Sequence, residues 1–446
     1  MKGSVILMNA YFAGRELIDE EIPTLPDEHI ATRPAIHMDN GQPRCRRCNN
    51  TTNFSSHHCA RCSQLCLYCR HCIQMGKISS CTILYRWIGP PPKHPENAGT
   101  MHWTGTLSDG QRIASSNVER AIVHLNEHLV WAVAGAGKTE VLFHGISSAL
   151  AAGKRVCIAA PRADVVRELA PRLAGVFPDT PPAALYGGSP NLHTYSPLVI
   201  TTTHQLYRFY HAFNVMIVDE VDAFPYTFNS SLQFAVQKAR KPDSALIYLT
   251  ATPNTDWQAE VKSGKREATI IPARYHRHPL PMPKTKWCGN WKKSLLPSAV
   301  HSWVKTKLDA GSRLLLFYPH IDTMEKALPL FKEIDPRIES VHAADPLRKE
   351  KVEAMRRREI PALLSTTILE RGVTFPGIDV AVIGAEDAVF TESALVQIAG
   401  RAGRSAGWPT GDIVFFHYGK TNAMMKAIRQ IKEMNRLGIE RGLIDG

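Results

Sequence analysis

The sequence predicts an α/β protein with two successive parallel-sheet lobes and a small cysteine-rich module ahead of them. Two observations predict this class. Short apolar runs alternate with helical patterns in two separate series, and eight of the ten cysteines fall between Cys45 and Cys81. Continuous apolar runs between helices are what a parallel sheet covered on both faces requires. At 446 residues the chain is also too long for one ordinary core.

Shifts in composition divide the chain into five segments. The proline run Pro90–Pro92 marks one boundary, and a stretch rich in proline, lysine and tryptophan marks another. The expected segments are, in order, a weakly structured lead-in at 1–40, a zinc-binding cysteine module at 41–90, a first lobe at 101–278, an interlobe connection at 279–293 and a second lobe at 294–446. The second lobe is expected to end in an amphipathic basic helix over 423–436.

The charge balance favours a polyanionic partner. The 53 basic and 41 acidic residues give a net charge of +12, which suits nucleic acid first and an anionic membrane surface second. A charge that serves only solubility stays open. No segment has the roughly 18 apolar residues that cross a bilayer, and the first residues lack a signal-peptide pattern. The protein is therefore expected inside the cell, where reduced thiols point to metal binding or catalysis.

A glycine-rich run, Ala132–Thr139, follows an apolar strand pattern and precedes a helical one. Glycines let successive backbone N–H groups turn toward phosphates, and the helix N-terminus adds partial positive charge. Lys138 is expected on the β- and γ-phosphates of ATP and the Thr139 hydroxyl on Mg²⁺. The residues expected to line the phosphates are Ala134, Gly135, Ala136, Gly137, Lys138 and Thr139.

A second strand, Val215–Val218, runs into two carboxylates about eighty residues after this loop. Asp219 is expected to bind Mg²⁺ and Glu220 to polarise the attacking water. By itself, an acidic turn after a strand is more often a solvated loop. The glycine-rich loop upstream favours the catalytic interpretation.

Several further segments resemble the motifs of superfamily-two helicases, in the expected order. They are Pro161-Arg162, Thr201–Gln205, Thr250-Ala251-Thr252, Ser365–Val373 and Gln397–Arg404. The resemblance implies two RecA-like lobes. It also implies Arg404 as the finger on the γ-phosphate, Arg401 beside it, and Gln397 in the nucleotide-binding set. Gln111 is expected to read the adenine edge, with a solvent-facing glutamine as the alternative. The expected DNA contacts are Arg162, Thr203, Gln205, Thr366 and Thr367.

The cysteines form three C-x2-C knuckles and two single thiols. Eight thiolates suffice for two four-cysteine zinc sites, and zinc would supply folding energy that a module this small lacks. An iron–sulfur cluster or a redox dithiol is the alternative, and the spacing leaves the pairing open. The expected ligands are Cys45, Cys48, Cys59, Cys62, Cys66, Cys69, Cys72 and Cys81. Cys157 and Cys288 are assigned no metal.

The cysteine head, Asp219–Tyr226, Ser365–Pro376 and Pro409–His417 together resemble the ComFA family of competence proteins. The resemblance implies an ATPase, stimulated by single-stranded DNA, that draws transforming DNA through a membrane channel. The implied partners are a ComEC-type channel and a ComFC-type companion, which would hold the protein at the inner face of the membrane. Whether the protein forms a homo-oligomer stays open. Resemblance to the head of the primosomal replication-restart helicase implies nested pairing, Cys45/Cys48 with Cys69/Cys72 and Cys59/Cys62 with Cys66/Cys81.

Two basic stretches are further candidates for DNA contact. Arg46 and Arg47 could form a DNA-facing patch, or be solvated. Trp287 and Trp291, among four lysines, could stack on a strand, or lie in a loose linker. Two other functions also stay open. One is a replication-restart type DNA helicase, for which no strand-separating insertion is visible. The other is a zinc scaffold that docks DNA at the channel without hydrolysing ATP.

Overall fold

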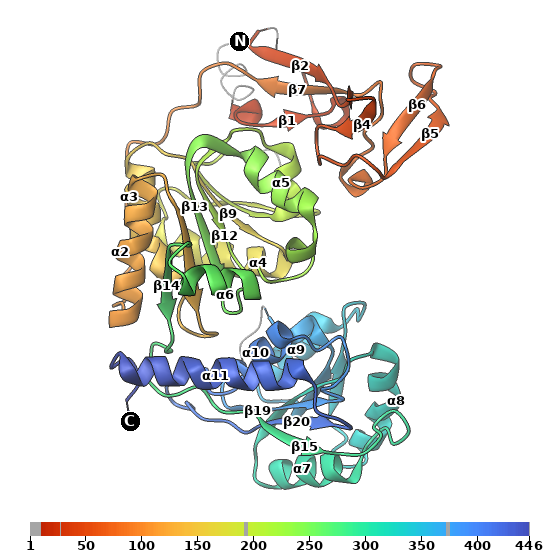
Figure 1. Ribbon diagram of the computed structural model, residues 1–446, viewed down its shortest axis with the longest axis vertical. Coiled ribbons are helices and arrows are strands. Elements are labelled where there is room, and N and C mark those ends of the chain that lie inside the picture. Colours follow the sequence, from red (N-terminus) through yellow and green to blue (C-terminus); the bar gives the residue numbers. More distant parts are fainter. Residues whose placement is uncertain (1–9, 27, 191–194, 372–374, 446) are drawn as a thin grey trace. The chain divides into compact units, whose positions relative to one another are not determined.

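The computed structural model describes residues 10–26, 28–190, 195–371 and 375–445 (Figure 1). By their contacts these residues form two compact units, each described by itself below. Unit 1 comprises 1–106, 112–130 and 139–269, and unit 2 comprises 107–111, 131–138 and 270–446. The glycine-rich loop is therefore counted with unit 2.

The N-terminal part of unit 1 is built from short antiparallel strands. β1 (Glu16–Leu17), β7 (Ile83–Trp87) and β2 (Ile30–Pro34) form a three-stranded sheet in the order β1-β7-β2. Two hairpins follow β2, and they carry five of the ten cysteines. Their strands are β3 (Ile36–Asp39) with β4 (Gln42–Cys45), and β5 (Phe54–His58) with β6 (Leu65–Cys69).

The prediction of a weakly structured lead-in is wrong over the described residues of 1–40. Phe12 and Leu17 are fully buried, and Tyr11 packs with them against Trp87. The apolar residues look scattered because they pack against a strand some seventy positions later in the chain. A local periodicity cannot reveal such a long-range pairing.

A buried ion cluster joins this segment to the rest of unit 1. The Glu16 carboxylate is buried, and its Oε1 lies 3.3 Å from the Lys238 Nζ. Arg33 pairs with the other carboxylate oxygen. Lys238 also donates to the Tyr207 carbonyl at 2.7 Å. Because Glu16 and Lys238 are paired where water is excluded, loss of the Glu16 carboxylate leaves the buried Lys238 ammonium uncompensated.

A Glu16→Ala variant should therefore lose about 3–5 kcal/mol of unfolding free energy. Urea titration of the full chain measures this loss. The matched control is Glu28→Ala, because the Glu28 side chain is 85% exposed and should change stability by less than about 0.5 kcal/mol. Equal stability of the two variants would contradict the buried cluster.

The larger sheet has seven strands in the order β10-β11-β9-β12-β13-β8-β14. Pairings from β10 through β13 are parallel, as the apolar runs predict. Figure 1 shows helices on both sides of it. The strands are β8 (Glu127–Ala132), β9 (Val156–Ala160), β10 (Ala183–Leu185), β11 (Leu198–Thr202), β12 (Phe213–Val218), β13 (Arg240–Thr250) and β14 (Ala268–Ile271). The helices are α2 (Asp109–Val123), α3 (Phe143–Ala151), α4 (Ala163–Val176), α5 (Ser230–Ala239) and α6 (Thr255–Lys262).

Unit 2 holds a six-stranded sheet in the order β15-β20-β19-β16-β18-β17, and all its pairings are parallel. The strands are β15 (Lys284–Trp287), β16 (Arg313–Phe317), β17 (Glu339–Val341), β18 (Ala362–Ser365), β19 (Ile378–Ile383) and β20 (Ile413–His417). The helices are α7 (Ser298–Asp309), α8 (Ile321–Lys332), α9 (Arg348–Arg356), α10 (Glu392–Ala399) and α11 (Asn422–Glu440). Together with the first sheet, this confirms the α/β class with two parallel-sheet lobes.

The stretch 279–293 does not form a loose connection. β15 adds to the edge of the second sheet beside β20. Trp291 is 1% exposed, and its indole N–H donates to the Glu386 carboxylate at 2.7 Å. Trp291 is therefore a core residue that cannot stack on DNA, whereas Trp287 is 65% exposed. The lysines and prolines around a short edge strand hid it from the sequence pattern.

Candidate nucleotide site and cysteine clusters

The glycine-rich loop leaves β8 at Ala132 and enters α3 through the short 3-10 turn Glu140–Leu142. Gly135 and Gly137 have φ values of +83° and +74°. Any other L-residue would be strained at both positions. These glycines allow the backbone curvature that turns N–H groups toward phosphate oxygens.

Gln111 is buried and faces this loop, which excludes the solvent-facing alternative. Its Nε2 donates to the Ala136 carbonyl at 2.9 Å, and its Oε1 accepts from the Ser108 backbone at 2.8 Å. The side chain thus braces the loop. Reading of the adenine edge stays a prediction.

Arg274, which lies three residues after β14, is a residue that no motif in the sequence marked. It is 2% exposed. Its guanidinium donates to the carbonyls of Ala134 at 3.0 Å, Gly400 at 3.1 Å and Ala402 at 2.7 Å. Burial, with the charge of Arg404 nearby, lowers the pKa of Arg274 to about 9. All these residues belong to unit 2. The guanidinium therefore holds the backbone of the glycine-rich loop against the backbone of the residues that follow α10.

The acidic turn after β12 belongs to unit 1. Asp219 is 8% exposed, and its Oδ1 accepts from the Glu220 backbone N–H at 2.8 Å. Glu220 has a φ of +52°, a left-handed conformation that non-glycine residues adopt at a cost of about 1–3 kcal/mol. Such local strain is found most often at functional sites.

Asp222 connects this turn to the end of β13 and to the residues that follow it. Its carboxylate accepts a hydrogen bond from the Thr250 hydroxyl at 2.7 Å and another from the Thr252 hydroxyl. Both segments are recognisable as motifs in the sequence, yet neither motif assigned Asp222 a role. The sequence did contain a signal for this contact, because a carboxylate and two hydroxyls lie at or just after the ends of two strands that pair in parallel.

In unit 2 the two arginines after α10 differ in environment. Arg401 is 3% exposed, and its Nε donates to the Glu370 carbonyl at 3.0 Å. Arg404 is half-buried, and its Nε donates to the Gly400 carbonyl at 3.2 Å. Gln397 is buried. Of the motif Ser365–Val373, Gly372 and Val373 lie outside the described residues.

The candidate DNA contacts are unequally accessible. Thr203 and Gln205 are both buried in the short turn after β11, and the Gln205 Oε1 accepts from Arg208. Contact with phosphates there would have to come from backbone N–H groups. Arg162, Thr366 and Thr367 are half-buried.

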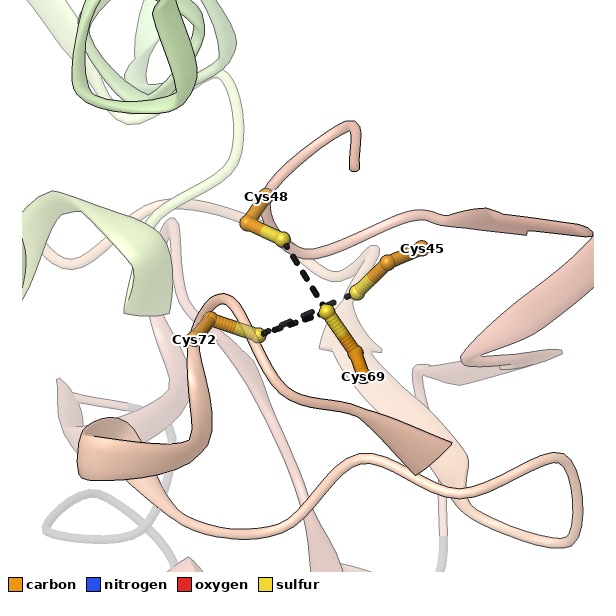
Figure 2. A group of neighbouring side chains, drawn as sticks. All are labelled: Cys45, Cys48, Cys69 and Cys72. Carbon is orange, nitrogen blue, oxygen red and sulfur yellow. Dashed lines mark hydrogen bonds between the residues drawn. The ribbon is translucent and has the colours of Figure 1, made fainter. Parts of the chain in front are cut away.

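Four cysteine side chains of the first cluster point toward one another (Figure 2). The Sγ atoms of Cys45 and Cys72 lie 3.9 Å apart, and those of Cys48 and Cys69 lie 3.6 Å apart. Four thiolates around a tetrahedral zinc have sulfur–sulfur distances of about 3.8 Å. The geometry fits zinc.

Arg47 lies against this cluster and does not form a DNA-facing patch. It is 2% exposed, and its Nη2 donates to the Cys72 Sγ at 3.2 Å and to the Cys72 carbonyl at 2.7 Å. A buried guanidinium offsets the negative charge of a four-thiolate site. The expected patch is therefore wrong for Arg47.

The remaining four cysteines form a second cluster. Cys59 and Cys81 have their Sγ atoms 3.7 Å apart, and Cys62 and Cys66 have theirs 3.3 Å apart. The backbone N–H groups of Cys62 and Arg61 lower the pKa of Cys59 to about 6, which favours the thiolate that binds metal. The two groups match the nested pairing.

The first cluster is also part of the core of unit 1. Its four cysteines belong to one hydrophobic cluster with Leu206, Tyr207 and Phe209. Burial, with the nearby Cys48 thiol, raises the pKa of Tyr207. The second cluster lies outside that core, and Cys62 and Cys81 are half-exposed.

Among the described residues no helix has the length and apolar content to cross a membrane.

Three families match successive parts of the chain. Residues 4–86 match "Competence protein ComFA N-terminal domain". Residues 104–255 match "Type III restriction enzyme, res subunit", and residues 292–406 match "Helicase conserved C-terminal domain". The two latter matches lie in the RecA-like lobes that the motifs predict.

Solved structures with a similar fold include helicases of low sequence identity. The DEAD-box helicase Mss116 bound to single-stranded RNA has a TM-score of 0.57 at 14% identity, covering 76% of this chain and 83% of that one. The Mycobacterium smegmatis helicase Lhr has a TM-score of 0.53 at 19% identity, covering 74% and 50%. These likenesses show the fold.

Two curated relatives cover almost the whole chain. Competence protein ComFA of Bacillus subtilis is 48% identical, over 92% of this chain and 89% of that protein. Competence protein ComFA of Streptococcus pneumoniae is 36% identical, over 98% and 99%. The protein belongs to the ComFA family of competence proteins.

Proposed function

We propose that this protein is an ATP-dependent translocase on single-stranded DNA that drives transforming DNA through a membrane channel during natural competence. Its ComFA relatives are named as competence proteins. The glycine-rich loop, the carboxylates after β12 and the helicase-type lobes support an ATP-driven activity on nucleic acid. The net charge of +12 suits a polyanionic substrate.

ATP binding is assigned to the loop that ends in Lys138 and Thr139. The Lys138 ammonium offsets charge on the β- and γ-phosphates. The Thr139 hydroxyl and the Asp219 carboxylate are the hard oxygen ligands that suit Mg²⁺, which neutralises phosphate charge when bound. Glu220 is assigned as the base that orients the attacking water.

Arg404 is assigned as the finger on the γ-phosphate. Arg401 is buried and hydrogen-bonded to the Glu370 carbonyl, whereas Arg404 is half-buried. The accessible guanidinium is the better placed to reach a bound nucleotide. Arg401 then supports it from inside unit 2.

The observation that carries the motor assignment is the pair of hydrogen bonds that Asp222 accepts from Thr250 and Thr252. Through these bonds Asp222 would pass a change in the Asp219–Glu220 turn to the end of β13 and the residues that follow it. A static scaffold needs no such connection, so the network favours an enzyme that couples hydrolysis to movement.

DNA contact is assigned mainly to the phosphate backbone, without base recognition. Arg162 and the backbone of Thr203 and Gln205 are proposed in unit 1. Thr366 and Thr367 are proposed in unit 2. The two cysteine clusters are proposed to hold one zinc each, as structural sites that stabilise the N-terminal module.

A ComEC-type channel and a ComFC-type companion are proposed as partners. They would place the protein at the cytoplasmic face of the membrane. Pull-down of purified protein with each partner checks this assignment.

ATP turnover should rise when single-stranded DNA is added, and the stimulation should weaken as salt increases. Each phosphate that the protein neutralises adds about −0.7 to the slope of log affinity against log salt. Steady-state ATPase assays with and without an oligothymidylate, over a series of KCl concentrations, measure both effects. Turnover indifferent to DNA at every salt concentration would refute the translocase.

The two alternatives predict different results. A replication-restart type helicase would unwind a forked duplex efficiently in a strand-displacement assay, which a pure translocase on one strand would not. A zinc scaffold would bind DNA but show no ATP turnover at all.

A further inference from the structure

A hollow of about 830 Å³ lies in unit 1, at the end of the sheet opposite the carboxylates that follow β12. Its wall is formed by the end of β7, the proline-rich segment after it, and the residues at which β9, β12 and β13 begin. Asp219 follows the other end of β12, which spans six residues. At roughly 3.3 Å per residue the two regions are about 20 Å apart.

The hollow is positively charged. Arg86, Lys93, Arg155 and Lys241 line it, and no aspartate or glutamate is among its described lining residues. Arg155 is 6% exposed. Its described contacts are carbonyl oxygens, including that of Ala13 at 2.8 Å, and aromatic rings, including Tyr195 at 4.6 Å. A buried guanidinium without a carboxylate projects positive potential into the space beside it.

The neighbouring groups respond to that potential. Burial and the charge of Arg155 lower the pKa of both His94 and Lys241. Cations held together in this way repel one another, and a bound anion would relieve the repulsion.

Aromatic rings alternate with the charges. The Arg86 guanidinium lies 4.7 Å from the centre of the Tyr210 ring. Trp87 is half-buried in the wall. One part of its side chain packs against Tyr11, Phe12 and Leu17, its indole N–H donates to the Pro90 carbonyl at 3.0 Å, and only the remaining part of the ring is open to a ligand. Cations that hold phosphates and rings that stack on bases are the combination by which proteins bind single strands without reading sequence.

We propose that this hollow is a second binding site for single-stranded nucleic acid, separate from the helicase motifs. Arg86, Lys93 and Lys241 hold phosphates and Trp87 stacks on a base. The identity of the strand as the translocated DNA rests on the proposed function. A membrane surface fits less well, because a flat bilayer cannot enter a hollow. An acidic peptide would pair with the cations but would leave the aromatic rings beside them without a stacking partner.

The test is equilibrium binding of the full chain, without nucleotide, to a fluorescent oligothymidylate at several KCl concentrations. The triple variant Arg86→Ala/Lys93→Ala/Lys241→Ala should bind at least about tenfold more weakly, and its salt slope should be smaller by about 2. Its basal ATP turnover should stay unchanged. The matched control removes three exposed lysines outside the hollow, Lys262→Ala/Lys265→Ala/Lys349→Ala, and should keep the parent slope.

Two further measurements keep the test independent of folding. Lys93 is exposed, so Lys93→Ala alone should reduce the slope by about 0.7 with an unchanged melting temperature. An oligonucleotide that carries 5-iododeoxyuridine should cross-link to Trp87 of the parent protein, and peptide mass spectrometry identifies the cross-linked residue.

Parent-like affinity and slope in the triple variant, with a parent protein that binds DNA and is stimulated by it, would overturn the second site alone. Absence of DNA stimulation in the parent would instead overturn the proposed function. Phosphatidylglycerol vesicles that bind the parent and not the triple variant, while both bind the oligonucleotide equally, would assign the hollow to lipid and refute the proposal.

Discussion

Lys138→Ala should hydrolyse ATP roughly 10²–10³-fold more slowly than the parent protein, because it removes the positive charge that we assign to the transferring phosphate. Gly135 and Gly137 hold the loop in its curved conformation independently of the lysine side chain. The fold and most of the single-stranded DNA binding should therefore persist. Steady-state phosphate release, circular dichroism and oligonucleotide binding measure the three properties.

Lys262→Ala is the control for the loss of one lysine, because this side chain is exposed on α6 and should leave turnover unchanged. Asp219→Asn removes the carboxylate that we assign to Mg²⁺ at almost constant side-chain shape, and it should slow turnover to a similar extent. Parent-like turnover in either site variant would contradict the assignment of the nucleotide site to the glycine-rich loop and the turn that contains Asp219.

Cys48→Ala should lower the zinc content from two ions to one and unfold the N-terminal part of unit 1. Binding of a structural zinc contributes about 10–16 kcal/mol to folding, which equals or exceeds the roughly 5–15 kcal/mol that stabilises an ordinary domain. Removal of one of four buried ligands also leaves three buried thiols without the metal that would hold them together. Metal analysis and thermal melting of the full chain measure the two effects.

Two cysteine variants make the matched comparison. Cys62→Ala also removes one zinc ligand, but from the half-exposed second cluster outside the core, so it should lower the zinc content with a smaller loss of stability. Cys157→Ala removes a buried thiol in β9 that belongs to neither cysteine cluster, and should leave two zincs. Two bound zincs in Cys48→Ala would contradict ligation by the first cluster.

Features carried by adjacent residues were the predictable ones. The loop Ala132–Thr139 needs its glycines at fixed offsets, and the structure gives Gly135 and Gly137 the positive φ values that such a loop requires. Each C-x2-C knuckle likewise sets two thiols at metal-binding distance through local geometry. The nested pairing of the knuckles came from resemblance, and the sulfur positions agree with it.

Features that depend on distant residues were not predictable. In the sequence Arg47 resembles a surface cation, whereas in the structure it is buried and donates to the Cys72 thiol. In the sequence Trp291 resembles part of a linker. In the structure its indole N–H donates to Glu386, almost a hundred residues later. The segment 1–40 shows no periodicity that would reveal a core, yet Glu16 is buried there and pairs with Lys238, more than two hundred residues later. In each case the partner is found by tertiary packing, which local composition does not encode.

The contact between the N-terminal strands and the first lobe limits whether these two parts can be separated or exchanged. A Cβ added at Gly14 would lie 2.6 Å from the Ala212 side chain, and the Tyr210 backbone N–H donates to the Gly14 carbonyl at 3.0 Å. The lobe therefore packs directly against the N-terminal strands at this contact, and the first cysteine cluster packs into the same core. A head transplanted from another family member would need a lobe with the same complementary contour, so the two parts are expected to be inherited, and exchanged, only as a pair.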